Sequence, residues 1–384
     1  MKNKCFVALI SILVITNLSC NTSKGGNSES NNEVKPDSTA VQTKSVGEAD
    51  KTLTNIARFI AGIPVDSSSS LYKLTQTAEW KKYRAESDSS WAKFNRLSGK
   101  ITKWKTNELP GTNEEFETLF YPFGGPDYLF ANIFFPKAKN YILIGLENPG
   151  AAPKIDGLNK DELKGALNLY KQAIEDVIQL SFFRTVDMKE ELKTQAIDGT
   201  TPIIMLFLAR AGKEIISVTP TTLDNDGKMI ESTAKDHVSV DIAFKSQEDS
   251  IVRHVYYLST NLADPSLSQN KPFMSFFDHI DPNAKSFVKS ATYLMHKSYF
   301  SIIRNTVLKK SAMILQDDSG IAYKFYDKAK WNITLYGTYE KPIPLFKDFY
   351  EADLFDAYKK ASKPVDFRYG YNRKSNFLLA QKKE

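Results

Sequence analysis

The sequence predicts a layered α/β protein with a mixed β-sheet. Helix-like and strand-like segments interleave along most of the 384 residues, and no internal repeat of fixed period is present. Such interleaving favours a sheet covered by helices, and it fits a sandwich or an all-helical array poorly. The run NYILIGLE at 140–147 is almost continuously apolar, which is typical of a strand buried on both faces. We expect a signal at 1–20, a tether at 21–48 and one large mixed α/β domain at 49–384.

The domain is expected to open with two helices. Apolar side chains at 53, 56, 57 and 60 fall on one helical face, and Gly62 and Pro64 end that helix. A serine-rich loop follows. The highly charged stretch 79–104 is the second helix, because its large apolar side chains recur at roughly helical spacing. The polar triplet at 88–90 is a candidate break in it.

The middle of the chain alternates between strands and helices. An aromatic stretch runs into the turn GGPD at 124–127, which feeds a helix with Pro126 at its first position. An amphipathic helix and a wholly apolar helix follow the buried strand. The expected order is strand 116–123, helix 128–135, strand 140–147, helix 161–183, helix 201–211 and strand 214–218.

The second half is predicted to be richer in strands. Two alternating segments flank a polar turn, which is typical of a hairpin. The tail after Phe377 is expected to be frayed, as chain ends often are. The expected order is hairpin strands 238–244 and 251–258, strand 287–296, helix 299–309, strand 312–315, strand 331–339 and an aromatic-rich helix 344–360.

The first twenty residues resemble a bacterial lipoprotein signal. Lys2 and Lys4 form a positive start, and Phe6 to Ile15 is an apolar core too short to span as a stable helix. Ser19 then precedes Cys20, which in such signals becomes the lipidated first residue of the mature chain. The resemblance implies a membrane partner through lipid on Cys20. Asn21, in place of an Asp, favours the outer over the inner membrane.

The segment 21–48 is predicted to be a flexible tether. It is polar, rich in Ser, Asn, Thr and Lys, and has no aromatic residue. Such composition cannot bury enough apolar surface to repay ordering. No later segment has 18 consecutive apolar residues, so we expect a protein anchored to the cell envelope by lipid that does not span the membrane.

Composition excludes several function classes. The net charge of +6 is spread out, without a basic stripe, so no nucleic-acid partner is expected. Of the two cysteines, Cys5 belongs to the signal and Cys20 to the anchor, which leaves no thiol or disulfide chemistry. The four histidines are not at metal-ligand spacing. We therefore predict no metal and no cofactor.

Aromatic residues make up 12% of the chain and crowd into three stretches, 116–135, 273–277 and 323–350. The simplest interpretation is core packing, because large rings dominate burial energy. The alternative is a platform for sugars or peptides, since Tyr and Trp are enriched at binding surfaces.

The best candidate site lies at predicted strand ends. Common catalytic and phosphate-binding fingerprints are absent. In layered α/β folds, ligands gather outside the carboxyl ends of strands. The candidate catalytic residues there are Asp127, Glu147, His296, Asp317 and Asp318. Paired carboxylates could share a proton or act as acid and base, and the Gly124-Gly125 turn could offer N–H groups to an anion.

Structural explanations compete with that site. Asp127 is well placed to cap the helix that follows it. The sequence DDSG at 317–320 is also an ordinary turn. A third alternative is a buried, hydrogen-bonded carboxylate that holds the core together.

Several blocks resemble a family of uncharacterised bacterial proteins, often lipoproteins. They are FYPFGGPDYLFANIFFPKAKNYILIGLE, SATYLMHKSYFSIIRNTVLKKS, ILQDDSGIAYKFY and YGTYEKPIPLF, and the similarity covers roughly Asn55 to Tyr371. The resemblance implies an envelope lipoprotein and transfers no catalytic residue. This chain has Gly124 where the family usually has Ser, and Asn148 where the family has Pro after GLE. A nucleophilic Ser at 124 would therefore be lost here.

Two functions remain open. The first is a binding or structural protein of the envelope, with protein or glycan partners unspecified. The second is a hydrolase or transferase that acts on an envelope glycan or ester through the acidic strand ends. Candidate residues around one cleft would favour the enzyme.

The anchor can be tested directly. We expect Cys20→Ala to abolish metabolic labelling with fatty acid and to release the protein from membranes, because the lipid is the proposed anchor. Labelling that persists in Cys20→Ala would contradict this. Co-fractionation of the wild type with inner-membrane markers would contradict the outer-membrane assignment.

Overall fold

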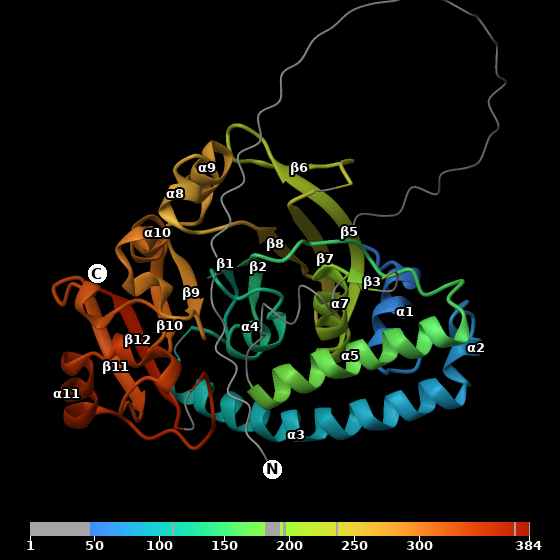
Figure 1. The fold of residues 1–384 in the computed structure, drawn as a ribbon, viewed down its shortest axis with the longest axis horizontal. Helices are drawn as coiled ribbons and strands as arrows, with labels where there is room; N and C mark the ends of the chain where they lie inside the picture. Colours follow the sequence, from blue (N-terminus) through green and yellow to red (C-terminus); the bar gives the residue numbers. More distant parts are fainter. Residues whose placement is uncertain are drawn as a thin grey trace, which may run out of the picture. The chain divides into compact units, whose positions relative to one another are not determined.

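The computed structural model describes residues 47–109, 111–180, 193–194, 197–235, 237–371 and 374–383. They form a ten-stranded sheet with helices on both faces (Figure 1), which confirms the mixed α/β class. The expected signal, Cys20 and residues 21–46 of the tether lie outside the described residues. Among the described residues, no helix is long and apolar enough to cross a membrane.

The described residues form helices before the first strand and between the strands. Their bounds are α1 Lys51–Ile60, α2 Tyr72–Thr75, α3 Ala78–Glu108, α4 Tyr128–Phe134, α5 Lys160–Leu180, α7 Thr201–Arg210, α8 Asp264–Leu267, α9 Lys271–His279, α10 Ser301–Lys310 and α11 Ala352–Ala361. Short 3-10 helices lie at Leu294–His296, Ser298–Phe300, Tyr323–Phe325 and Pro344–Phe349.

The strands of the main sheet run in the order β11-β12-β10-β9-β1-β2-β8-β7-β5-β6. Their bounds are β1 Phe116–Tyr121, β2 Ala138–Gly145, β5 Lys213–Leu223, β6 Met229–Glu231, β7 Ser239–Ser246, β8 Val252–Ser259, β9 Ala284–Val288, β10 Ser311–Gln316, β11 Trp331–Gly337 and β12 Asn376–Lys382. A separate ribbon pairs β3 (Lys193–Thr194) with β4 (Ile197–Asp198).

The five central strands are parallel, and their order reverses at β1. From β1 the chain moves outward to β2 and then β8, and later returns to β9 on the other side of β1, followed by β10. The switch point of the sheet therefore lies between β1 and β9, where open α/β sheets bind their ligands. Antiparallel strands extend both ends of the sheet.

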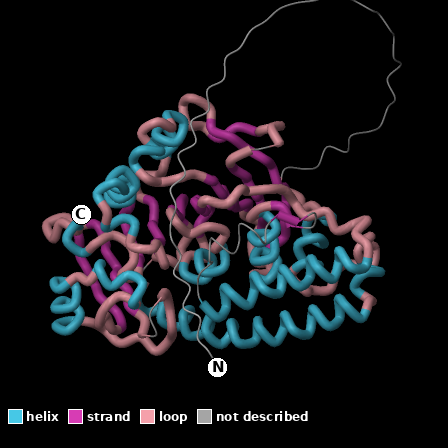
Figure 2. The backbone as a smooth tube through the Cα atoms, in the orientation of Figure 1, coloured by secondary structure: helices cyan, strands magenta, loops and turns pink. Residues whose placement is uncertain are grey.

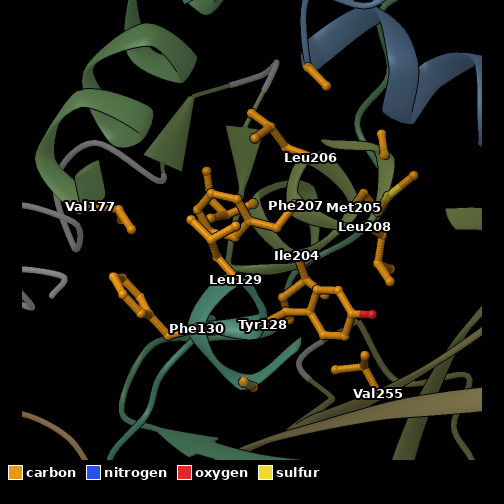
Figure 3. Packing of buried hydrophobic residues seen from close by; sticks show 14 of the residues in the cluster. Tyr128, Leu129, Phe130, Val177, Ile204, Met205, Leu206, Phe207, Leu208 and Val255 are labelled. Atoms are coloured by element: carbon orange, nitrogen blue, oxygen red, sulfur yellow. The ribbon is translucent and has the colours of Figure 1, made fainter. Parts of the chain in front are cut away.

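Each face of the sheet has its own core, because side chains alternate along every strand. On one face α1, α3, α4, α5 and α7 pack over odd-numbered β1 residues such as Leu119. On the other face α8 to α11 pack over Phe120. Figure 2 shows the long helices gathered below the strands, and Figure 3 shows α4 side chains such as Leu129 beside Phe207 of α7.

Most predicted elements are present, with local corrections. Helix α3 runs unbroken through 88–90, because Asp88 is paired with Arg84 (3.5 Å) and Arg210 (2.8 Å) and so does not compete for the helix backbone. Pro126 lies outside α4, since Asp127 is the N-cap. The predicted helix 344–360 divides into a 3-10 helix and α11.

Two corrections change the site. Strand β9 ends at Val288, not at 296, so His296 ends a 3-10 helix and does not end a strand. The tail after Phe377 is not frayed. It forms β12, which inserts between β10 and β11 and is buried from Asn376 to Ala380. Phe377 stacks on Trp104 (5.1 Å between ring centroids) and packs on Tyr369 (4.2 Å).

Candidate functional site

The candidate residues follow strands that share one edge of the sheet. Asp127 follows β1, Glu147 follows β2, and Asp317 and Asp318 follow β10 directly. His296 comes eight residues after β9 ends. The parallel strands bring these loops to one side, as strand-end reasoning requires. The side chains are nevertheless buried: exposure is 2% for Asp127, 6% for Glu147, 2% for Asp317 and 7% for Asp318.

Asp127 closes the switch point through a buried ion pair. Lys289, the first residue after β9, lies 2.7 Å from the Asp127 carboxylate, and both side chains are almost completely buried. Tyr121 donates its hydroxyl to the same oxygen (2.9 Å), and the Phe130 N–H donates to the other (3.0 Å). Burial raises the pKa of the Asp127 carboxyl, and the Lys289 ammonium opposes that rise.

The Gly124-Gly125 turn makes room for the Tyr121 ring, which binds Asp127. A Cβ at Gly124 would lie 2.7 Å from the Tyr121 ring, so the glycine makes room for the ring that reaches Asp127. The Gly125 N–H donates to the Ile144 carbonyl (3.1 Å). The helix start is capped by Asp127 itself. The Gly125 donor and the space beside Gly124 are used internally, which argues against an anion site at this turn.

Asp317 braces the loop that follows β9. One carboxylate oxygen accepts from the Ser319 N–H (3.0 Å) and hydroxyl, and the other accepts from the Ser290 N–H (2.9 Å). Gly370, at φ +70°, approaches so closely that a Cβ would lie 2.6 Å from the second oxygen. Burial, reinforced by the neighbouring Asp318, raises the pKa of Asp317 to about 7.

Asp318 ties the same turn to the C-terminal strand. Its N–H donates to the Asn376 amide oxygen (2.8 Å), and the Asn376 amide nitrogen donates back to its carboxylate (3.0 Å). Tyr293 donates its hydroxyl to the other carboxylate oxygen. The acidic turn therefore fits the third alternative, a buried and hydrogen-bonded carboxylate pair, because each of the four oxygens accepts a hydrogen bond from within the protein.

These bonds hold a strained loop. Among the described residues, the non-glycine positions with positive φ are Phe123 after β1 and Ser290, Thr292 and Tyr293 after β9. Such conformations persist only where the surroundings over-determine them. Ser319 supplies this restraint, because its hydroxyl accepts from the Ala291 N–H (2.8 Å) and its carbonyl accepts from the Tyr293 N–H (3.1 Å).

Glu147 lies beside Tyr257, whereas His296 lies beside Tyr293, the residue that donates to Asp318. Glu147 accepts the Tyr257 hydroxyl at its backbone carbonyl (2.8 Å) and the Leu146 N–H at its carboxylate (3.1 Å). His296 packs against the rings of Tyr293 and Phe349, and burial lowers its pKa to about 4. The five candidates therefore fall into three groups: Asp317, Asp318 and His296 around Tyr293, Asp127 with Lys289, and Glu147 with Tyr257.

Two hollows are open to solvent among the described residues. One, of about 650 Å³, lies around residues 337–338, 362–368 and 374–375, and the other lies on the face of the sheet. It is a groove of about 410 Å³ over β1, β2, β8, β7 and β5, on the side of α9. The lining residues are Thr118, Asn140, Ile142, Thr219, Thr221, Met229, Glu231, Asp241, Tyr256, Phe276, His279 and Ile280. The sequence placed none of them in a site. The sequence pattern that could have indicated this groove is the polar residues at alternate positions of the predicted hairpin, such as Asp241 and His254.

A hairpin forms one wall of this groove. The β5–β6 turn docks on α9, where Gly227 (φ +79°) comes so close that a Cβ would lie 2.2 Å from the Phe276 nitrogen. The Asp226 carbonyl lies 2.8 Å from His279 Nε2. On the floor, Asp241 binds His254 Nδ1 at 2.8 Å, and the His254 ring lies parallel to Tyr256. The groove is therefore pre-formed by packed elements.

The chain matches no protein-family model, no curated protein and no solved structure. Among the described residues, no group of three His, Cys, Asp or Glu side chains could hold a metal ion.

The protonation of Asp317 gives a test of the edge. A carboxyl whose pKa is raised in the folded state binds its proton more tightly when folded, so stability falls as pH rises from about 4 to about 7. Each such proton contributes a slope of about 1.4 kcal/mol per pH unit inside that window. We expect the free energy of unfolding of Asp317→Asn to depend less on pH than that of the wild type, by the slope that one proton contributes. Urea unfolding at intervals from pH 5 to pH 8 measures this difference.

Only the difference between the two proteins is informative. Glu351, whose pKa burial raises to about 7, adds a slope of the same sign, and His296 adds one of opposite sign below about pH 6.5. Both contributions persist in the variant. Equal slopes in wild type and Asp317→Asn would show that Asp317 titrates normally.

Proposed function

We propose that the protein is a lipid-anchored component of the cell envelope with a binding role, and that its ligand lies in the groove on the sheet face. The observation that supports the binding role is the contrast between the strand ends and the groove on the sheet face. The edge carboxylates are buried and hydrogen-bonded within the protein, whereas Asp241 and Tyr256 in the groove are only partly buried and Glu231 is exposed. Ligand sites are usually pre-formed hollows with a few polar groups among apolar ones.

The envelope location rests on the sequence. The apolar core before Cys20 and the polar tether behind it would hold the domain at the membrane surface with its groove free. A hydrolase or transferase at the strand ends is the weaker proposal. General acids and bases must come within hydrogen-bond reach of the reacting group, and these carboxylates instead accept from neighbouring loops.

A substitution can block the groove without changing the buried carboxylates at the strand ends. Thr219 lines the groove, and Thr222 is half-buried on the same strand with its side chain on the opposite face. We expect Thr219→Trp to abolish co-sedimentation of the detergent-solubilised full chain with delipidated cell-wall material, because the indole fills the hollow. Wild type and the matched control Thr222→Trp should still co-sediment.

The thermal unfolding midpoints of both tryptophan variants, measured beside the sedimentation, separate blocked binding from misfolding. If Thr219→Trp folds and sediments as well as wild type does, the groove is not the ligand site.

A further inference from the structure

The groove floor is built by strand register. Thr118 of β1 pairs with Asn140 of β2, and Asp241 of β7 lies between Tyr256 of β8 and Thr219 of β5. Residues paired across neighbouring strands lie on the same face. The register therefore lines up hydroxyl, amide, carboxylate and phenol groups across five strands, on a part of the sheet that the groove leaves open.

The charge of the lining argues against an anionic ligand. The twelve described residues that line the groove include the carboxylates Asp241 and Glu231 but no lysine or arginine. A phosphate or carboxylate ligand would meet like charge without a cation to pair with. The threonine, asparagine and tyrosine side chains are neutral donors and acceptors, which suit hydroxyl groups on a ligand.

One carboxylate is held in a fixed orientation. Asp241 contacts His254 Nδ1 through both oxygens, at 2.8 and 3.1 Å, and the side chains of Asp241 and His254 remain 23% and 30% exposed. Each carboxylate oxygen has a further lone pair, so a ligand hydroxyl can donate to it beside the histidine. Hydrogen bonds from O–H groups to a carboxylate are short and strong.

Aromatic rings complete the site. Tyr256 lies on the floor and Phe276 on the α9 wall. Rings at a binding surface give large apolar contact area at low entropy cost, and Tyr adds a hydroxyl. Rings together with acceptor groups match a molecule that has apolar C–H faces and a rim of hydroxyls.

We infer that the groove binds a neutral carbohydrate chain. This inference rests on the proposed function and assigns its ligand class. The ligand's hydroxyls donate to Asp241 and to the threonine and asparagine oxygens, while a sugar ring packs on Tyr256. No covalent step is involved.

The test uses the full chain in a detergent without a sugar head group. Isothermal titration calorimetry compares maltotetraose, cellotetraose and N-acetylated chitotetraose with tetralysine and with tetragalacturonate. We expect a neutral tetrasaccharide to bind, and the two charged oligomers not to bind. Tyr256→Ala and Asp241→Asn should each weaken that binding about tenfold or more. Tyr350→Ala, at a tyrosine that is 46% exposed and outside the groove lining, is the matched control and should bind as wild type does.

Each contrary result has a distinct meaning. Binding of tetralysine or tetragalacturonate in place of the neutral chains overturns the ligand class, and so does the absence of binding to all three neutral chains. Both results leave the proposed function standing if Thr219→Trp still loses the cell wall. A neutral chain that binds Tyr256→Ala as tightly as wild type shows that the groove is not its site.

Discussion

The Asp127–Lys289 ion pair is the contact on which the arrangement of this edge depends. It joins the loop after β1 to the loop after β9, at the one place where the strand order of the parallel core reverses. In open α/β sheets that place is normally a ligand crevice. Here the two charged side chains, the Tyr121 ring and the α4 cap occupy it. A buried pair of this kind contributes little net stability, yet it is costly to break on one side only.

The second polar group extends the same edge. The turn after β10 holds the strained loop after β9 and binds Asn376 at the start of β12. The loops after β1, β9 and β10 and the start of β12 are thus fixed by hydrogen bonds to buried carboxylates, with apolar cores on both faces of the sheet. The strand ends therefore stabilise the fold, and the open sheet face is left for the ligand that we propose.

Local patterns in the sequence were sufficient for the fold class. The periodicity of 161–183 predicted α5, the apolar run at 140–147 predicted β2, and the alternation around the turn at 246–249 predicted the β7–β8 pair. Strand β12 was missed because its end position resembled a loose tail. Its insertion between β10, more than sixty residues earlier in the chain, and β11 buries it. Such long-range pairing leaves no local signal in a single sequence.

The site was predictable only in outline. The position of Asp127, Glu147, Asp317 and Asp318 after predicted strands indicated that they lie at one edge of the sheet. The same position does not distinguish solvent-facing carboxylates from buried ones. Their partners Lys289 and Asn376 come from segments 162 and 58 residues away, and no local pattern connects residues at such separations. The groove depends on strand register across five strands and on the docking of a hairpin, neither of which composition or motifs report.

A double-mutant cycle on Asp127 and Lys289 tests the central claim most directly. Urea unfolding is measured for Asp127→Asn, for Lys289→Met and for the double variant, with the exposed pair Lys374–Glu340 as control. Each single change should cost about 3–5 kcal/mol, because it removes the ion-pair partner of a buried charge, and the double variant should lose much less than the sum. The control pair should show little coupling. Additive losses at Asp127 and Lys289, or single losses below about 0.5 kcal/mol, would contradict the account.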